Sequence, residues 1–209
     1  MVPMAALLEQ CAPQVSPVLM QALVRAESAG QAYAIGMDSS HGNVKQPATL
    51  AEAVRTARQL AGAGRKFSVG LAQVHVSNVT RYGLSWEQAF DPCQNLAAGQ
   101  KILWHFYHRA SASGYSGVAA IWAALRGYNS GGVHRTLSDD YAHRIFAYMS
   151  SASPDVQIGR GIPAIAAGAR PAAGDSPQAG TVPTPALTSA PAPRSGSLDI
   201  FQKTQPAGF

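Results

Sequence analysis

The chain has 209 residues, a formal net charge of +5, and 46% hydrophobic residues. This length allows one domain with an appendage or two small domains, and no stretch reaches the roughly 20 apolar residues that a membrane-spanning helix needs. A mild basic excess suits an anionic polymer, such as nucleic acid, a lipid surface or a cell-wall glycan. No run of Lys and Arg, and no interleaving of basic with aromatic residues, is present, which argues against nucleic acid as a partner.

Composition divides the chain near residue 153. Nine of the 14 prolines lie from Pro154 onward, in a stretch rich in Ala, Pro, Gly, Ser and Thr. Such a stretch cannot bury enough apolar surface to offset its ordering entropy. We therefore predict a folded domain over residues 1–153 and a disordered Pro/Ala-rich tail over residues 154–209. The part before Pro154 carries 12 basic and 8 acidic residues, so most of the charge excess belongs to the domain.

The first residues hold a short apolar patch without a preceding positive segment, so they make a poor signal peptide. The first predicted helix follows, with Ser16 as its N-cap and Pro17 as its first helical residue. Its apolar residues recur at helical spacing, and Glu27 projects from the same stripe. Loss of hydration there favours the neutral carboxyl group, which is the form that a general acid needs near neutral pH. The alternative is a partly exposed glutamate in a last helical turn.

Caps and apolar periodicity predict further helices. The expected elements, in chain order, are a loop over 31–46, a helix from the capping box Thr49–Glu52 to about Ala61, a tight turn leading into a helix within 67–82, a helical turn or two from Ser85, a long helix capped by Asp91 that stops by Gly114, a helix from Ser116 to the region of Asn129, and a last helix from Ser138. No run alternates apolar and polar residues over the length of a strand. We therefore expect an all-α, mainly helical domain.

Three short patterns accompany Glu27. The first is Ser68-Val69-Gly70-Leu71-Ala72-Gln73, in which Ser and Gln offer neutral hydrogen bonds and Gly lets the backbone approach a ligand closely. The second is a glycine-rich helix end that contains Tyr128 and Asn129, and the third is Tyr141 on the last predicted helix. Taken singly, these patterns also suit a helix start, a helix C-cap and a core tyrosine.

In this order and spacing, the patterns resemble those of the lytic transglycosylases with the goose-lysozyme-like fold. In that family a Glu-Ser pair ends a helix, and motifs of the form Ser-x-Gly-Leu-Met-Gln and Ala-Tyr-Asn follow before a further tyrosine. The matching residues here are Glu27-Ser28, Ser68 to Gln73, Gly127-Tyr128-Asn129 and Tyr141. The chain departs from these motifs at two positions: Ala72 stands where the family has methionine, and Gly127 stands where it has alanine. Both residues are small, so we expect the site to stay intact.

Two flanking segments narrow the resemblance. Cys11-Ala12-Pro13 and Asp91-Pro92-Cys93-Gln94-Asn95-Leu96 are similar to the specialised transglycosylases of type IV secretion systems. The resemblance covers about Cys11 to Met149. It implies a periplasmic enzyme that opens the cell wall locally for secretion or conjugation machinery, with peptidoglycan glycan strands as substrate. The resemblance does not extend to the tail, but the short apolar patch Ser197-Leu198-Asp199-Ile200-Phe201 makes the tail a candidate contact for components of that machinery.

The resemblance also implies roles for the site residues. Glu27 would act alone as acid and then base, cleaving the β-1,4 bond between N-acetylmuramic acid and N-acetylglucosamine and forming a 1,6-anhydro ring. Ser68 and Gln73 would hold the N-acetyl or nearby sugar groups. The residues expected to line the cleft are Tyr128, Asn129 and Tyr141.

The remaining polar residues are assigned no chemistry. No cofactor is implied, and His105 and His108 lack further ligands at metal spacing. Asp139 and Asp140 are interpreted as helix-start acids. Cys11 and Cys93 can form a disulfide in an oxidising compartment, whereas two buried thiols are expected inside a cell; export would favour the pairing.

Two other functions stay open on the sequence. A lysozyme-type hydrolase of the same fold would use similar residues but admit water. A non-catalytic wall-binding assembly factor would use the tail as its chief interaction surface.

Overall fold

The structure, a computed structural model, describes residues 3–38 and 42–150. The predicted tail over residues 154–209 and the domain boundary at residue 153 lie outside these residues. The elements are α1 (Met4–Cys11), α2 (Pro17–Ser28), β1 (Ile35–Met37), α3 (Leu50–Gly62), β2 (Phe67–Val69), β3 (Val74–His75), α4 (Val76–Arg81), α5 (Trp86–Phe90), α6 (Pro92–Ala112), α7 (Gly117–Ser130), a 3₁₀ turn (Thr136–Ser138) and α8 (Asp139–Met149).

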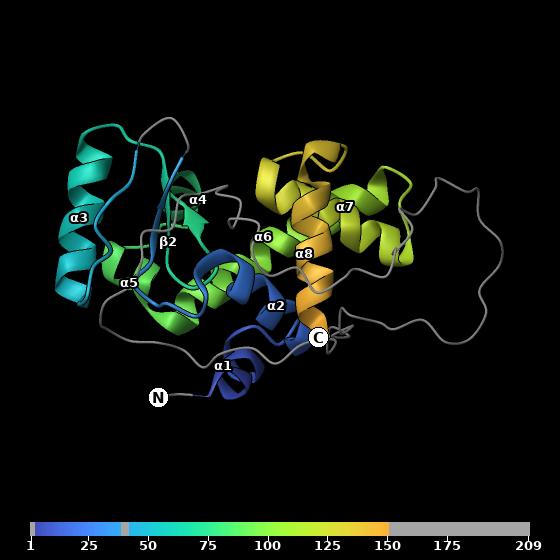
Figure 1. The fold of residues 1–209 in the computed structure, drawn as a ribbon, viewed down its shortest axis with the longest axis horizontal. Coiled ribbons are helices and arrows are strands. Elements are labelled where there is room, and N and C mark those ends of the chain that lie inside the picture. The colour runs from blue at the N-terminus through green and yellow to red at the C-terminus, as the bar shows by residue number, and fades with distance from the viewer. Residues whose placement is uncertain (1–2, 39–41, 151–209) are drawn as a thin grey trace, which may run out of the picture.

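The helices form two groups joined by the long helix α6 (Figure 1). The three strands lie with α3, α4 and α5 at one end of the molecule, and α7 packs against α6 at the other end, beside α8. Helix α8 also packs against α2, so the last helix of the described chain contacts the first predicted one. Large aliphatic and aromatic side chains fill the interior between these elements, among them Phe67, Phe90, Leu103, Leu125 and Ile145.

Most of the predicted helix boundaries are confirmed because their caps are present. Asp91 accepts a hydrogen bond from the Gln94 N–H at 2.9 Å and starts α6. Ser85 and Gln88 form the reciprocal capping box of α5. Thr49 caps α3 as expected, but the Glu52 carboxylate accepts from the Ala48 N–H instead of from that of Thr49.

Other caps and elements differ from expectation. Ser16 occupies the N-cap position of α2 without making a side-chain cap hydrogen bond. The apolar patch near the N-terminus forms α1, which periodicity over so few residues did not predict. Asp139 does more than start a helix. Its carboxylate accepts hydrogen bonds from the Trp122 ring N–H and from Nε and Nη2 of Arg126.

The predicted all-α, mainly helical fold is confirmed, and the structure adds one small three-stranded sheet that the sequence did not predict. Strand β2 pairs antiparallel with β1 and with β3, with Ile35 opposite Val69 and Ser68 opposite His75. The strands are only two or three residues long and are buried on both sides, so no alternation of apolar and polar residues marks them. Gln46 completes the outer edge, because its side-chain amide both donates to and accepts from the backbone of Ile35.

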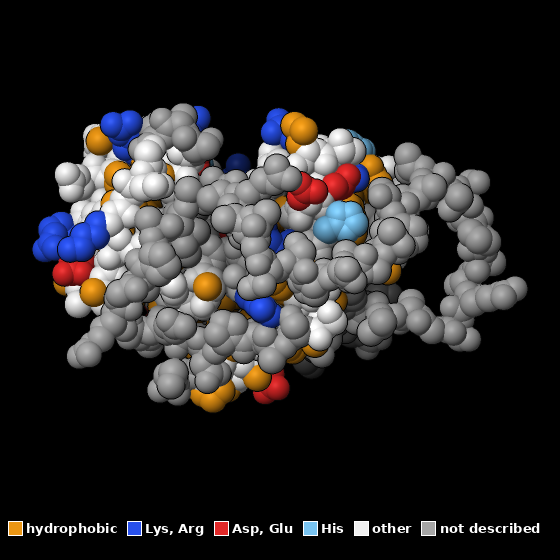
Figure 2. All heavy atoms as spheres, in the orientation of Figure 1, with side chains coloured by type: hydrophobic (Ala, Val, Ile, Leu, Met, Phe, Trp, Pro, Cys, Tyr) orange, Lys and Arg blue, Asp and Glu red, His pale blue; other side chains and the backbone are white. Residues whose placement is uncertain are grey.

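The surface carries charges of both signs. On the face shown in Figure 2, Lys and Arg side chains lie over α3 with an acidic side chain next to them, and acidic, basic and His side chains lie over the group of α7 and α8. Within the two described stretches, no helix is both long and apolar enough to cross a membrane.

A disulfide between Cys11 and Cys93 joins the end of α1 to the first turn of α6, with the Cα atoms 5.0 Å apart. It closes a loop with a sequence separation of 82 residues. Because a cross-link of this span restricts the unfolded chain strongly, it stabilises the fold by about 4 kcal/mol in the chain-entropy description.

Reduction of this disulfide is therefore expected to lower the free energy of unfolding by up to about 4 kcal/mol. Urea unfolding with and without reductant measures the change. The double variant Cys11→Ala/Cys93→Ala serves as the control and is expected to be indifferent to reductant. An unfolding midpoint of the wild type that reductant does not move would contradict the prediction.

Candidate active site

Glu27 lies in the last turn of α2, directly before the helix ends at Ser28. The helix stops because Ala29 adopts a left-handed conformation, φ 52°, and donates its N–H to the Arg25 carbonyl. Gly30 continues the turn at φ 83°. Glu27 keeps some exposed surface as a whole residue, whereas its carboxyl group is enclosed by protein atoms. The predicted position of Glu27 on the inner stripe of α2 is therefore confirmed.

Tyr141 is the direct partner of this carboxyl group. It lies on α8 with 4% of its surface exposed, and its hydroxyl donates a hydrogen bond to Glu27 Oε1 at 2.5 Å. Burial raises the pKa of Glu27 from its ordinary 4.5 to about 7, while the Tyr141 hydrogen bond and the Arg144 charge oppose this rise. Near neutral pH, Glu27 therefore holds its proton far more readily than an exposed glutamate does, as a general acid requires.

Tyr128, on α7, belongs to the same cluster. Burial raises its pKa well above the usual range, and the nearby charge of Glu27 adds to the effect. Its hydroxyl donates to the backbone carbonyl of Ala72 at 2.6 Å. The structure thus brings Glu27, Tyr128 and Tyr141 together from three helices, α2, α7 and α8.

The turn between β2 and β3 lies against the end of α2. The Ser28 hydroxyl donates to the Leu71 carbonyl at 2.7 Å, so the residue after Glu27 fixes this turn. Gln73 adopts φ 45°, and its side-chain amide donates to the carbonyls of Gly70 and Ala34 at 2.9 and 3.2 Å. The amide N–H groups of Gln73 therefore hold the turn itself together.

Asn95, a fully buried residue on α6, is the centre of this arrangement. Its carboxamide nitrogen donates to the carbonyls of Val69 and Ala89, and its oxygen accepts from the Ala72 N–H at 2.7 Å. Gly70, at φ 79°, makes the contact possible, because a Cβ atom there would lie 2.2 Å from the Asn95 side-chain nitrogen. The sequence motif contained Asn95, but nothing in its spacing identified it as the anchor of the turn.

Two further predicted residues have partners of their own. Asn129 is exposed at the end of α7, and its amide donates to the Ser138 hydroxyl at 3.1 Å, next to the start of α8. Ser68 lies on β2, opposite His75, with 9% of its surface exposed. Their roles toward a sugar stay predictions.

Arg144 was not predicted as part of the site. It lies one turn after Tyr141 on α8, with its guanidinium carbon 5.5 Å from the centre of the Tyr141 ring. Its positive charge lowers the pKa of both Glu27 and Tyr141, against the larger effect of burial. In the sequence, the position of Arg144 three residues after Tyr141, about one helical turn, was the signal that could have identified it as part of the site.

The possible second acids are engaged elsewhere. Asp38 faces His75 at 4.0 Å, Asp91 caps α6, and Asp139 pairs with Arg126. Across residues 3–38 and 42–150, no group of three His, Cys, Asp or Glu side chains could hold a metal ion. The arrangement therefore offers one enclosed carboxyl group that can donate and later recover a proton, next to two neutral phenols.

Replacing Asn95 with alanine is expected to destabilise the fold by about 3 kcal/mol or more, because three buried backbone groups lose their partner. Urea unfolding measures the loss. Gln94→Ala, one residue earlier and exposed on the same helix, is the matched control and should lie within about 0.5 kcal/mol of wild type. Equal stabilities of the two variants would contradict the role assigned to Asn95.

Glu27→Gln is expected to stabilise the protein at pH 8 but hardly at pH 4. The raised pKa means that the folded state binds the Glu27 proton more tightly than the unfolded state, so stability falls as pH rises from 4.5 to about 7. Above that pH, burial of the charged carboxylate lowers the free energy of unfolding by about 3 kcal/mol. A glutamine at this position still accepts the hydrogen bond from Tyr141 and carries no charge, so it avoids this loss. Unfolding free energies at both pH values test this.

Glu9→Gln, a change of the same kind at an exposed residue of α1, is the control for this pH comparison. A Glu27→Gln variant whose stability relative to wild type is the same at both pH values would show that the carboxyl group is not desolvated.

Comparison with known proteins agrees with this geometry. The model of the transglycosylase SLT domain matches residues 4–147. The type IV secretion system protein virB1 of Brucella abortus is 48% identical over 110 residues, which are 53% of this chain and 46% of that protein. Protein virB1 of Agrobacterium fabrum is 24% identical over 136 residues, 65% of this chain and 55% of the relative.

The chain thus spans about half the length of the curated relatives it matches, and no solved structure matches it. The family model covers more than half of the chain, including Glu27, the turn before β3 and both tyrosines. The family predicted from the sequence motifs is therefore confirmed: the chain belongs to the transglycosylase SLT domain family.

Proposed function

We propose that this chain is a peptidoglycan lytic transglycosylase that acts in the periplasm and opens the cell wall locally for a type IV secretion or conjugation machine. The observation that carries the activity is the enclosed Glu27 carboxyl group, with a pKa of about 7, hydrogen-bonded to Tyr141. Family membership and the similarity to virB1 proteins support the substrate and the cellular role.

In the first step Glu27 gives its proton to the oxygen that links C1 of N-acetylmuramic acid to C4 of N-acetylglucosamine. The C1–O bond breaks, and the N-acetylglucosamine leaves with the proton on its C4 oxygen. Positive charge develops at C1, and the N-acetyl group of the same muramic acid stabilises it. The Tyr141 hydroxyl and the Arg144 charge stabilise the carboxylate that remains on Glu27.

In the second step the Glu27 carboxylate takes the proton from the C6 hydroxyl of the muramic acid. The C6 oxygen then bonds to C1, closing the 1,6-anhydro ring, and Glu27 is protonated again. No water is consumed. This use of one residue as acid and base is consistent with the positions of Asp38, Asp91 and Asp139, each of which has another partner.

The surrounding residues have a positioning role in this proposal. Ser68 and Gln73 would hold the N-acetyl or neighbouring sugar groups through polar groups that the turn leaves available. Tyr128, Tyr141 and Asn129 would line the sugar cleft. The two tyrosines stay neutral because burial raises their pKa values well above the usual range, so they can donate hydrogen bonds without adding negative charge near Glu27.

Glu27→Gln is expected to lower the cleavage of purified sacculi by roughly 10²–10⁴-fold, because it removes the proton donor with little change of shape. Mass spectrometry of the released muropeptides measures both rate and product. Wild type should release 1,6-anhydro products, each one water lighter than the hydrolysis product and without a reducing end.

Glu9→Gln, at an exposed position on α1, should cleave like wild type. Reducing-end products from the wild type would instead indicate a lysozyme-type hydrolase, and undiminished cleavage by Glu27→Gln would remove Glu27 from the mechanism. Absence of cleavage by wild type would favour a wall-binding assembly factor.

A further inference from the structure

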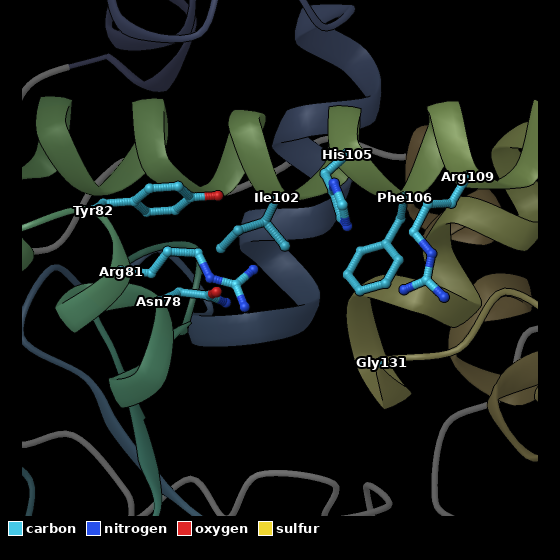
Figure 3. A pocket seen from close by; sticks show the side chains of 8 residues that line it. All are labelled: Asn78, Arg81, Tyr82, Ile102, His105, Phe106, Arg109 and Gly131. Carbon is cyan, nitrogen blue, oxygen red and sulfur yellow. The ribbon is translucent and has the colours of Figure 1, made fainter.

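A cavity of about 320 Å³ lies between α4, α6 and the end of α7. Figure 3 shows its lining: α4 contributes Asn78 and Arg81, with Tyr82 directly after the helix, and Gly131 follows α7 on the opposite side. The lining residues from α6 are Ile102, His105, Phe106 and Arg109.

The cavity is basic. Arg81 and Arg109 lie on opposite sides of it, His105 lies between them, and no Asp or Glu is among the lining residues (Figure 3). Among the described residues, Arg58 pairs with Glu87 and Arg126 pairs with Asp139, while Asp38 lies 4.0 Å from His75. Within this part of the chain, no carboxylate pairs with Arg81 or Arg109. Two opposed guanidinium groups with uncompensated charge favour an anionic ligand.

This cavity adjoins the candidate active site through Tyr82 and α6. Tyr82 lies close enough to Tyr128 to raise its pKa, as the charge of Glu27 also does, although burial is the larger cause. Ile102, which lines the cavity, follows Gly99 by three residues on α6, and a Cβ atom at Gly99 would lie 3.2 Å from the Tyr128 hydroxyl. A polymer in the sugar cleft would therefore pass near the basic cavity.

We propose that this cavity binds carboxylate groups of the stem peptides that the glycan strand carries. The inference rests on the proposed function and adds the peptide to the recognised substrate. Stem peptides are acidic and branch from every muramic acid, so a basic recess beside the sugar cleft meets them whenever a strand is bound. The cavity is also concave and small, which suits a short side branch better than a nucleic acid duplex.

The test is a comparison of two substrates and two variants. Full-length protein is assayed on peptide-bearing glycan strands and on the same strands after their peptide carboxylates have been converted to carboxamides. Wild type should cleave the amidated strands with a kcat/KM about five- to tenfold lower, mainly through a higher KM, because exposed cations contribute modest energies each. Arg81→Gln/Arg109→Gln should be slow on the untreated strands and indifferent to amidation.

The matched control is Arg55→Gln/Arg65→Gln, which removes the same charge at exposed positions on α3 and in the loop after it. Neither residue lines the cavity. This control should discriminate between the substrates as wild type does. A cavity variant that still discriminates as strongly as wild type, or a control that loses discrimination equally, would overturn the proposal.

A binding measurement separates this proposal from the proposed function. Calorimetric titration with a free stem tetrapeptide should show weaker binding to Arg81→Gln/Arg109→Gln than to wild type, whether or not the wild type cleaves strands. Equal binding by the two proteins would overturn the cavity assignment even for an active enzyme. Failure of wild type to cleave either strand, with the difference in peptide binding intact, would overturn the proposed function alone.

Discussion

The hydrogen bond from Tyr141 to Glu27 is the interaction on which the site depends. It joins side chains 114 residues apart in sequence, so it exists only because α8 packs against α2. Burial alone favours the neutral carboxyl group, whereas the hydrogen bond and the Arg144 charge favour the carboxylate, and the balance gives a pKa of about 7. Small changes in how α8 lies on α2 therefore change the acid strength of Glu27, because all the opposing groups come from α8.

A second constraint is the buried turn before β3, which three helices hold by their polar side chains. Ser28 of α2, Asn95 of α6 and Tyr128 of α7 each bond to the backbone of residues 71 or 72. Helices α2 and α7, which carry Glu27 and Tyr128, are thus fixed to the same turn, whereas α8 joins the site through the hydrogen bond from Tyr141 to Glu27. The arrangement keeps the backbone polar groups of a buried turn satisfied, and it explains why the sequence motifs that accompany Glu27 are far apart in the chain and yet belong to one site.

The sequence predicted the elements whose local signals are strong. Asp91 and Ser85 are N-cap residues that predicted the starts of their helices. The apolar stripe that includes Glu27 predicted that its carboxyl group is buried. The three strands could not be predicted, because they are too short and too buried to show alternation. The roles of Asn95, Arg144 and Asp139 depend on contacts between distant segments, and no spacing in a single helix encodes the partner of a buried amide or an ion pair. Family motifs supplied Tyr128 and Tyr141, since a lone tyrosine is as consistent with the core.

The two departures from the family motifs are accommodated by their neighbours. Ala72 meets Gly99, where a Cβ atom would lie 2.5 Å from that of Ala72, so a glycine on α6 makes room for the turn. At Gly127, a Cβ atom would lie 2.3 Å from the ring of Phe106, so the alanine of the family motif would collide with this ring as it now lies. Phe106 also forms part of the wall of the basic cavity, and the Arg109 guanidinium group lies 5.6 Å from its ring centre. The absence of a methyl group at Gly127 therefore leaves room for Phe106 where it lies, and Phe106 in turn forms part of the wall of the basic cavity.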